Sequence, residues 1–276
     1  MDVSQPKRVL ITGGSSGLGK ALALCFANQA HKICIADLND ERGQETLEQL
    51  NALSGEAIYQ HCDVTNQDDL DACVAAMKEQ WGGIDVVINN AGVASGGPVD
   101  WLSADDWKWI MDINFFGVVK GCQAAIPSMK EQGFGHIVNV ASMAGLLNPA
   151  GMSNYNVSKA AVISLSETLV TELKPHGIGV TCLCPSFFKT NLGESMRSPD
   201  QATANNLSKL MDSSDELTAE DIAQAVYDAV ASNQFLLMPH SKARQAYEFK
   251  CKDLDAFLDS QERLANSVKN KATRSE

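Results

Sequence analysis

A chain of 276 residues, 45% of them apolar, can bury one sizeable core, so we expect one large α/β domain with additions. The net charge of −12 argues against nucleic acid and anionic membranes, because a polyanion repels an acidic protein that lacks a basic patch. We therefore predict no nucleic-acid partner. We also predict no membrane span, since no segment approaches the roughly 20 apolar residues that a transmembrane helix needs.

The N-terminal residues read MDVSQPKRVLITGG and lack the basic region, long apolar stretch and cleavage site of a signal peptide. A cytoplasmic location is therefore expected. The eight cysteines are scattered, and their spacing predicts no metal site. Cys182 and Cys184 share one apolar run, and we expect them to point to opposite faces of a strand as ordinary packing thiols.

Apolar runs alternate with segments long enough for helices. The predicted strands are 8–13, 32–37, 56–63, 84–92, 135–142 and 179–185, with a last short run at 235–238. Val86, Val87 and Ile88 are apolar on both faces of their strand, as a parallel sheet between two helix layers requires. The sequence therefore predicts a doubly wound α/β fold, with about seven parallel strands and helices on both faces.

Two segments fall outside this alternation. Residues 187–217 mix glycine, proline and polar residues with Met196, Leu207, Leu210 and Met211, which suggests a lid-like insertion in a single catalytic domain, 1–239. Residues 240–276 carry eight Lys/Arg and six Asp/Glu and have apolar residues near helical spacing, which predicts an amphipathic helical extension. This extension could pack on its own subunit, form a subunit interface or cover the active site.

A glycine-rich turn follows the first predicted strand and opens a helix. Glycine at 13, 17 and 19 allows a tight turn and close approach of a pyrophosphate to the helix N-terminus. Asp37 ends the second strand about 20 residues further on, where a carboxylate accepts hydrogen bonds from the adenosine ribose. A carboxylate there repels a 2′-phosphate, so NAD is favoured over NADP.

These motifs resemble those of the single-domain short-chain dehydrogenase/reductase family, whose Rossmann-type fold the alternation fits. The turn TGGSSGLG has the family's Thr-Gly-x-x-x-Gly-x-Gly spacing, and Asn89–Gly92 and Tyr155–Lys159 resemble its Asn-Asn-Ala-Gly and Tyr-x-x-x-Lys motifs. The segment from Pro185 resembles its Pro-Gly-x-x-x-Thr, with Ser186 where glycine is usual. The resemblance and the turn together predict these cofactor-binding residues: Thr12, Gly13, Ser15, Ser16, Gly17, Leu18, Gly19, Asp37, Leu38, Asp63, Val64, Asn90, Ala91, Gly92, Tyr155, Lys159, Pro185, Phe188 and Thr190.

The catalytic residues that the resemblance implies are Asn114, Ser142, Tyr155 and Lys159. Tyr155 and Lys159 are four apart and share one helix face. A free tyrosine has a pKa near 10, and the Lys159 ammonium together with NAD⁺ is expected to lower it, so that Tyr155 serves as general acid and base. Ser142 can polarise the carbonyl, and in the family the asparagine orders a water beside the lysine.

We therefore predict hydride transfer between NAD(H) and a secondary alcohol/ketone or an aldehyde. Apolar residues adjacent to the motifs favour a lipophilic substrate, unless they only close the core over the cofactor; they are Val93, Met143, Leu146, Leu147, Phe187, Leu192 and Met196. The alternatives are an acyl-thioester ketoreductase of lipid synthesis and a non-catalytic nicotinamide-sensing interaction protein. The resemblance also implies a homodimer or homotetramer, paired through the helices that carry Asn114 and Tyr155.

Overall fold

The computed structural model describes residues 5–53, 55–188, 191–200 and 217–272, with the side chains of 191 and 264–272 outside the description. Within these ranges, seven parallel strands form one sheet in the order β3-β2-β1-β4-β5-β6-β7. The strands are β1 (Arg8–Thr12), β2 (Lys32–Asp37), β3 (Ala57–His61), β4 (Val86–Asn89), β5 (Gly135–Val140), β6 (Ile178–Leu183) and β7 (Leu236–Leu237).

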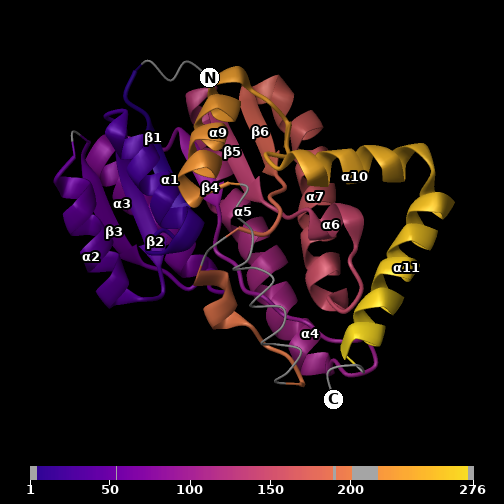
Figure 1. Cartoon of the computed structure of the whole chain (residues 1–276). Helices are drawn as coiled ribbons and strands as arrows, with labels where there is room; N and C mark the ends of the chain where they lie inside the picture. The colour runs from indigo at the N-terminus through magenta and orange to yellow at the C-terminus, as the bar shows by residue number, and fades with distance from the viewer. Residues whose placement is uncertain (1–4, 54, 189–190, 201–216, 273–276) are drawn as a thin grey trace.

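Helices cover both faces of this sheet (Figure 1). One face carries α1 (Gly17–Asn28), α2 (Asp40–Asn51) and α9 (Ala219–Ser232). The other carries α3 (Gln67–Trp81), α5 (Gly117–Gln132) and α7 (Ser153–Leu173). The remaining helices are α4 (Ala104–Met111), η1 (Asp112–Phe116), α6 (Ala144–Leu147), η2 (Lys174–His176), η3 (Asn191–Ser195), α10 (Ser241–Lys252) and α11 (Leu254–Ala272). The predicted doubly wound fold is confirmed.

Successive side chains of the central strands pack into two different cores. In β1, Val9 and Ile11 face the α1 and α9 layer, while Leu10 faces the α5 and α7 layer. The expectation that Cys182 and Cys184 point to opposite faces is wrong. Residues two apart in a strand share a face, and the two Sγ atoms lie 3.9 Å apart in the α5 and α7 layer.

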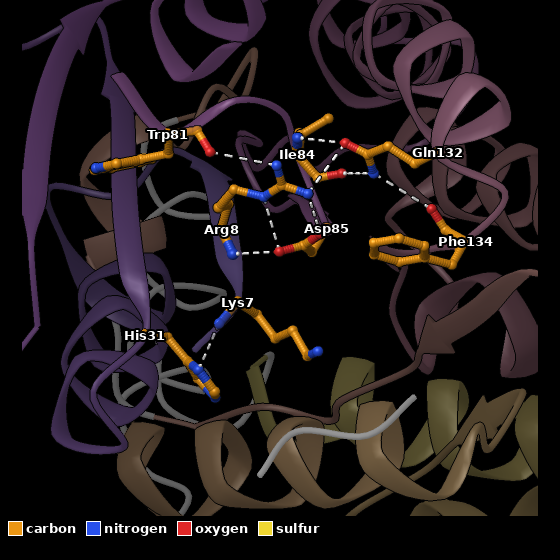
Figure 2. Close-up of polar contacts among 8 residues, drawn as sticks. All are labelled: Lys7, Arg8, His31, Trp81, Ile84, Asp85, Gln132 and Phe134. Atoms are coloured by element: carbon orange, nitrogen blue, oxygen red, sulfur yellow. Dashed lines mark hydrogen bonds and ion pairs between the residues drawn. The ribbon is translucent and has the colours of Figure 1, made fainter. Parts of the chain in front are cut away.

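A polar network holds together the sheet edge at the N-terminal ends of the strands (Figure 2). The Arg8 guanidinium forms an ion pair with Asp85 and also donates hydrogen bonds to the backbone oxygen of Trp81 and to Gln132. Asp85 also accepts a hydrogen bond from the Arg8 backbone N–H, at 2.8 Å. The Gln132 amide bonds both the N–H and the C=O of Ile84. This network joins β1 to the ends of α3 and α5, away from the strand ends that form the site.

Replacing Asp85 by alanine is expected to lower the free energy of unfolding by about 2 kcal/mol, because a partly buried guanidinium then loses its counter-ion. The carboxylate is 6% exposed and its Arg8 partner 17%, so little water is available to replace it. Chemical denaturation of both proteins measures the difference. Asp100→Ala, at an exposed position, is the matched control, and equal stability of the two variants would contradict the prediction.

Two helices follow β7, where the sequence predicted one amphipathic helical extension. In Figure 1, α10 extends away from the side of the fold that holds β6 and α7, and α11 turns sharply down from the far end of α10. Phe257 is buried in the core on the α7 side, and Lys250 Nζ donates a hydrogen bond to the backbone oxygen of Leu146. The extension thus packs on its own chain, while Leu254 and Leu258 are exposed. The division of the chain at residue 239 remains a prediction.

Candidate functional site

A cavity of about 470 Å³ opens at the carboxyl ends of the strands, where β1 and β4 lie side by side. The chain leaves this pair of strands in opposite directions, which is where open α/β sheets bind ligands. Residues after each of the strands β1 to β6 line it. Those also predicted from sequence are Gly13, Ser16, Gly17, Leu18, Asp37, Leu38, Asp63, Val64, Asn90, Ala91, Gly92, Ser142, Tyr155, Lys159, Pro185 and Phe188.

The glycine-rich turn brings α1 close to the end of β1. Gly13 has φ +64°, and a Cβ on it would lie 2.9 Å from Ala91 Cα. A Cβ on Gly19 would lie 2.0 Å from the Gly13 oxygen. Larger residues would therefore separate the helix from the turn. Gly19 packs against Gly13 and is not among the residues that line the cavity, so its predicted part in cofactor binding stays a prediction.

The N-terminus of α1 differs from those of its neighbours. Side chains of Asn39, Asn66, Ser103 and Thr218 cap α2, α3, α4 and α9, each with acidic residues in the first turn. Among the described residues, α1 has neither a side-chain cap nor an acidic first turn. Its first amide groups therefore have no side-chain cap beside the cavity, which Ser16, Gly17 and Leu18 line, and this arrangement suits a phosphate group.

Thr12 and Asn90 fix the two loops that meet beneath this turn. Thr12 Oγ1 accepts hydrogen bonds from the backbone N–H groups of Asn90 and Ala91, at 3.0 and 3.1 Å. The Asn90 side chain in turn donates to the backbone oxygens of Thr12 and Gly13, at 2.9 and 3.1 Å. Thr12 is thus buried behind the cavity, where it joins the loop after β1 to the loop after β4.

Asp37 lies at the carboxyl end of β2. In the sheet, β1 and β4 separate β2 from β5, the strand that precedes Ser142. The Asp37 carboxylate accepts hydrogen bonds from the backbone N–H groups of Ser15 and Asn39, at 3.1 and 3.0 Å. Each oxygen keeps acceptor capacity for further donors. Ser15 therefore acts here by orienting Asp37 and is not among the residues that line the cavity.

Asn114 lies in a π-helical turn, Asp112–Phe116, inserted between α4 and α5. Such turns are rare and frequently occur at functional sites. The Asn114 side chain is fully buried and bonds both the N–H and the C=O of Val93, at 2.8 and 3.0 Å, as well as Ser158 Oγ at 3.2 Å. It thereby ties the loop after β4 to α7, the helix that carries Tyr155 and Lys159.

Ser142, Tyr155 and Lys159 come together at the cavity wall. Ser142 follows β5, and its Oγ accepts the Ala144 backbone N–H at 3.1 Å. Lys159 Nζ lies 5.8 Å from the Tyr155 ring centroid and donates to the backbone oxygen of Val140 at 3.0 Å. All three side chains are less than 10% exposed. Two helical residues and one strand-end residue thus line the same cavity, and their catalytic roles stay a prediction.

Burial shifts the titration of both ionisable members of this group. It raises the pKa of Tyr155 to about 12, an effect that the Ser142 hydroxyl opposes. It lowers the pKa of Lys159 to about 8, an effect that the neighbouring Cys184 and Cys182 oppose. The lowered tyrosine pKa expected from the sequence is therefore not found in the cofactor-free chain, because burial outweighs the nearby groups.

Apolar residues form the wall beside Tyr155. Val93, Phe187 and Leu192 line the cavity, and they pack in a small cluster with Met143 and Met196. Leu146 and Leu147 were expected here but belong to the main core, because α6 turns them toward α7 and α10. Of the predicted lid, 187–188, 191–200 and 217 are described, while Thr190, Leu207, Leu210 and Met211 lie outside the described residues.

Sequence reasoning missed several polar residues at this site, among them Arg42, Glu194 and His240. Arg42 on α2 and Glu194 on η3 both line the cavity and form an ion pair 2.9 Å long at its exposed rim. His240 accepts a hydrogen bond from the Ser186 backbone. Arg42 follows Asp37 by five residues and could have been considered. Glu194 and His240 offered no signal, because their contacts join residues distant in sequence. Within the described ranges, no group of three or more potential metal ligands is present.

Comparisons with known proteins agree with this geometry. The model of the short chain dehydrogenase family matches residues 7–201. Zerumbone synthase from Zingiber zerumbet is 39% identical over 192 residues, 67% of this chain and 70% of that protein. The 3-oxoacyl-[acyl-carrier-protein] reductase FabG of Chlamydia pneumoniae is 33% identical over 186 residues, 67% of this chain and 75% of its own. A short chain dehydrogenase/reductase from Burkholderia phymatum, solved in complex with NAD, has a TM-score of 0.86 and 33% identity, covering 93% of this chain and 96% of its own.

Proposed function

This chain belongs to the short-chain dehydrogenase/reductase family of oxidoreductases, and from that membership we propose that it transfers hydride between NAD(H) and a secondary alcohol/ketone or an aldehyde. The observation that carries the proposal is the convergence of Ser142, Tyr155 and Lys159 on the cavity that the glycine-rich turn and Asp37 also line. The residues proposed to bind the cofactor and those proposed to react thus line one cavity.

The fit to NAD rests on residues at both ends of the cavity. The uncapped start of α1 suits the pyrophosphate, and Asp37 suits the adenosine ribose hydroxyls. Arg42 and Lys159 are the cations among the described lining residues. Arg42 is paired with Glu194, so it would have to leave this partner to bind a 2′-phosphate. The neighbouring structure from Burkholderia phymatum holds NAD, in agreement with this choice.

The protein's own residues would then perform the proton chemistry. NAD(H), when bound, supplies or accepts the hydride. In the reductive direction, Tyr155 Oη donates its proton to the carbonyl oxygen, while Ser142 Oγ donates a hydrogen bond to the same oxygen. The Lys159 ammonium stabilises the resulting phenolate. The backbone oxygen of Val140 accepts a hydrogen bond from this ammonium and holds the lysine in place. Asn114 holds the loop after β4 against α7 through hydrogen bonds to Val93 and Ser158.

Because burial raises the pKa of Tyr155, we expect the bound cofactor to help to ionise the phenol. In the cofactor-free chain the phenol keeps its proton at neutral pH, which suits a general acid for carbonyl reduction. For alcohol oxidation the phenolate must form, and a positive charge beside the ring favours it. We therefore expect bound NAD⁺ and Lys159 together to lower the pKa of Tyr155, which Lys159 alone does not do.

The substrate proposed for this site is lipophilic. Val93, Phe187 and Leu192, which line the cavity near Tyr155, present carbon atoms to it, and Met143 and Met196 support them from behind. Methionine adapts its shape to irregular apolar partners. Residues of this kind bind an apolar body more readily than a sugar or a phosphate ester. Activity confined to polyols would contradict this part of the proposal.

Two alternatives remain distinguishable. Acyl-thioester reduction is favoured by the similarity to FabG, whereas Asp37, which disfavours NADPH, argues against it. A nicotinamide-sensing protein without turnover would not need four predicted catalytic residues held in place by buried contacts.

Homo-oligomerisation through α5 and α7 stays a prediction, supported by the exposed side chains of Phe116 and Val157. A cytoplasmic location also stays a prediction. Among the described helices, none is long and apolar enough to cross a membrane.

Fluorescence titration with NADH and NADPH, followed by a panel of lipophilic and polar carbonyl compounds, tests the proposal. We expect NADH to bind at least about 10-fold more tightly than NADPH, because a 2′-phosphate beside the Asp37 carboxylate costs more than about 1.4 kcal/mol. Asp37→Asn should narrow that ratio. Tighter binding of NADPH would overturn the role of Asp37, and binding without turnover of any carbonyl or acyl thioester would favour the sensor.

A further inference from the structure

His240 connects the C-terminal helices to the loop that follows β6. It immediately precedes α10 and is 1% exposed. Its Nδ1 accepts a hydrogen bond from the Ser186 backbone N–H at 3.1 Å, across 54 residues of sequence. The imidazole ring also lies 6.2 Å from the Phe188 ring, centroid to centroid. One side chain thus contacts the backbone of Ser186 and the side chain of Phe188.

The segment that His240 holds is part of the cavity wall. Pro185, Ser186, Phe187 and Phe188 all line it. The Pro185 backbone oxygen accepts a hydrogen bond from the backbone N–H of Met143, the residue after Ser142, at 2.9 Å. Ser186 stands where the family resemblance leads one to expect glycine. It retains the backbone N–H, and His240 supplies the acceptor for this part-buried group.

A second contact shows that α10 spans two loops of the site. At the other end of this helix, Lys250 donates to the backbone oxygen of Leu146 in α6, which follows Ser142 closely in the chain. The first contact therefore fixes the loop after β6, and the second fixes the loop after β5. These are the two loops that carry the predicted nicotinamide contacts and the hydroxyl of Ser142.

We propose that His240 is a positioning residue, which holds the Pro185–Phe188 segment against the nicotinamide half of the bound cofactor. Through it, the C-terminal extension becomes part of the cofactor site. The inference rests on the proposed function. It requires Nδ1 to accept, so the neutral ring carries its proton on Nε2. The competing interpretation is that the ring only fills space beside Phe188.

Two substitutions separate these interpretations. His240→Phe keeps an aromatic ring but removes the acceptor, whereas His240→Asn removes the ring but keeps an oxygen acceptor close to the position of Nδ1. His176→Phe, at an exposed histidine in η2, is the matched control. Four quantities are measured in each protein: the Kd for NADH by fluorescence, kcat/KM for a carbonyl substrate, the melting temperature, and hydrogen exchange of the Ser186 amide.

We expect His240→Phe to raise the Kd for NADH and lower kcat/KM, each by about 10-fold, because a part-buried hydrogen bond that holds the cavity wall is lost. The Ser186 amide should exchange faster even without cofactor. His240→Asn should stay within about 3-fold of the unmodified protein in Kd and kcat/KM. This order of effects, with His176→Phe unchanged, supports positioning.

Other outcomes overturn it. If His240→Phe retains binding while His240→Asn loses it, the ring acts by packing alone. If both variants match the unmodified protein, the contact has no role. If both are equally impaired, unchanged protection of the Ser186 amide in His240→Phe would dismiss the hydrogen bond. An unmodified protein that binds no NADH would refute the proposed function itself, whereas normal binding with unaffected variants would refute this inference alone.

Discussion

Tyr155→Phe is expected to lower kcat/KM for carbonyl reduction by about 10³-fold, within the range that general acid–base groups contribute. The phenol is the buried group whose proton can reach a carbonyl oxygen beside Ser142, and phenylalanine fills the same space without it. Tyr155 packs in the cluster with Ala94, Ile110 and Met152, so the ring should stay in place. Steady-state kinetics and NADH titration of the variant measure turnover and binding separately.

The Kd for NADH should change by less than about 3-fold, because the tyrosine hydroxyl contributes at most one hydrogen bond to the cofactor. Tyr227→Phe is the matched control, since it removes a hydroxyl from α9, on the opposite layer of the fold. The assignment of Tyr155 as proton donor would fail if the variant retained more than about a tenth of the original kcat/KM. A loss of binding equal to the loss of turnover would instead indicate damage to the cofactor site.

Local patterns in the sequence were sufficient for the sheet and for most of the cavity. Parallel strands buried on both faces are continuous apolar runs, so the positions of Val86 and Ile137 could be read directly. Because the chain enters each loop from the carboxyl end of a strand, motifs at strand ends meet at one edge of the sheet. That is why Asp37, Asn90 and Ser142, far apart in sequence, line the same cavity, while their roles in binding and catalysis stay predictions.

The missed features depend on contacts that no local pattern encodes. The ion pair of Arg42 with Glu194 and the bond of Ser186 to His240 join residues 152 and 54 positions apart. Their formation depends on how the lid segment and the C-terminal helices fold back over the sheet. The placement of Leu146 and Leu147 failed for a related reason, since adjacency to Ser142 in sequence does not determine which way the short helix α6 turns its side chains.

Titration of Lys159 was likewise beyond the sequence, because the shift comes from burial. In the folded, cofactor-free chain burial lowers its pKa from 10.5 to about 8. Between these two values the unfolded chain holds a proton that the folded chain has released. The free energy of unfolding therefore rises with pH in this window, and the cost of burying the ammonium is fully present below about pH 8.

Lys159→Met should remove this pH dependence as well as turnover. Relative to the variant, the cofactor-free protein is expected to gain about 2 kcal/mol of unfolding free energy between about pH 7 and pH 9.5, since each unit of pKa shift corresponds to about 1.4 kcal/mol. Denaturant unfolding at the two pH values measures it, and titrations of other groups cancel in the difference. Lys174→Met, at an exposed position, should run parallel to the unmodified protein. If Lys159→Met also runs parallel to the unmodified protein, Lys159 keeps its ordinary pKa and the prediction is wrong. The ammonium would then stabilise the Tyr155 phenolate up to pH 9.5. In that case kcat/KM for alcohol oxidation should show no fall near pH 8.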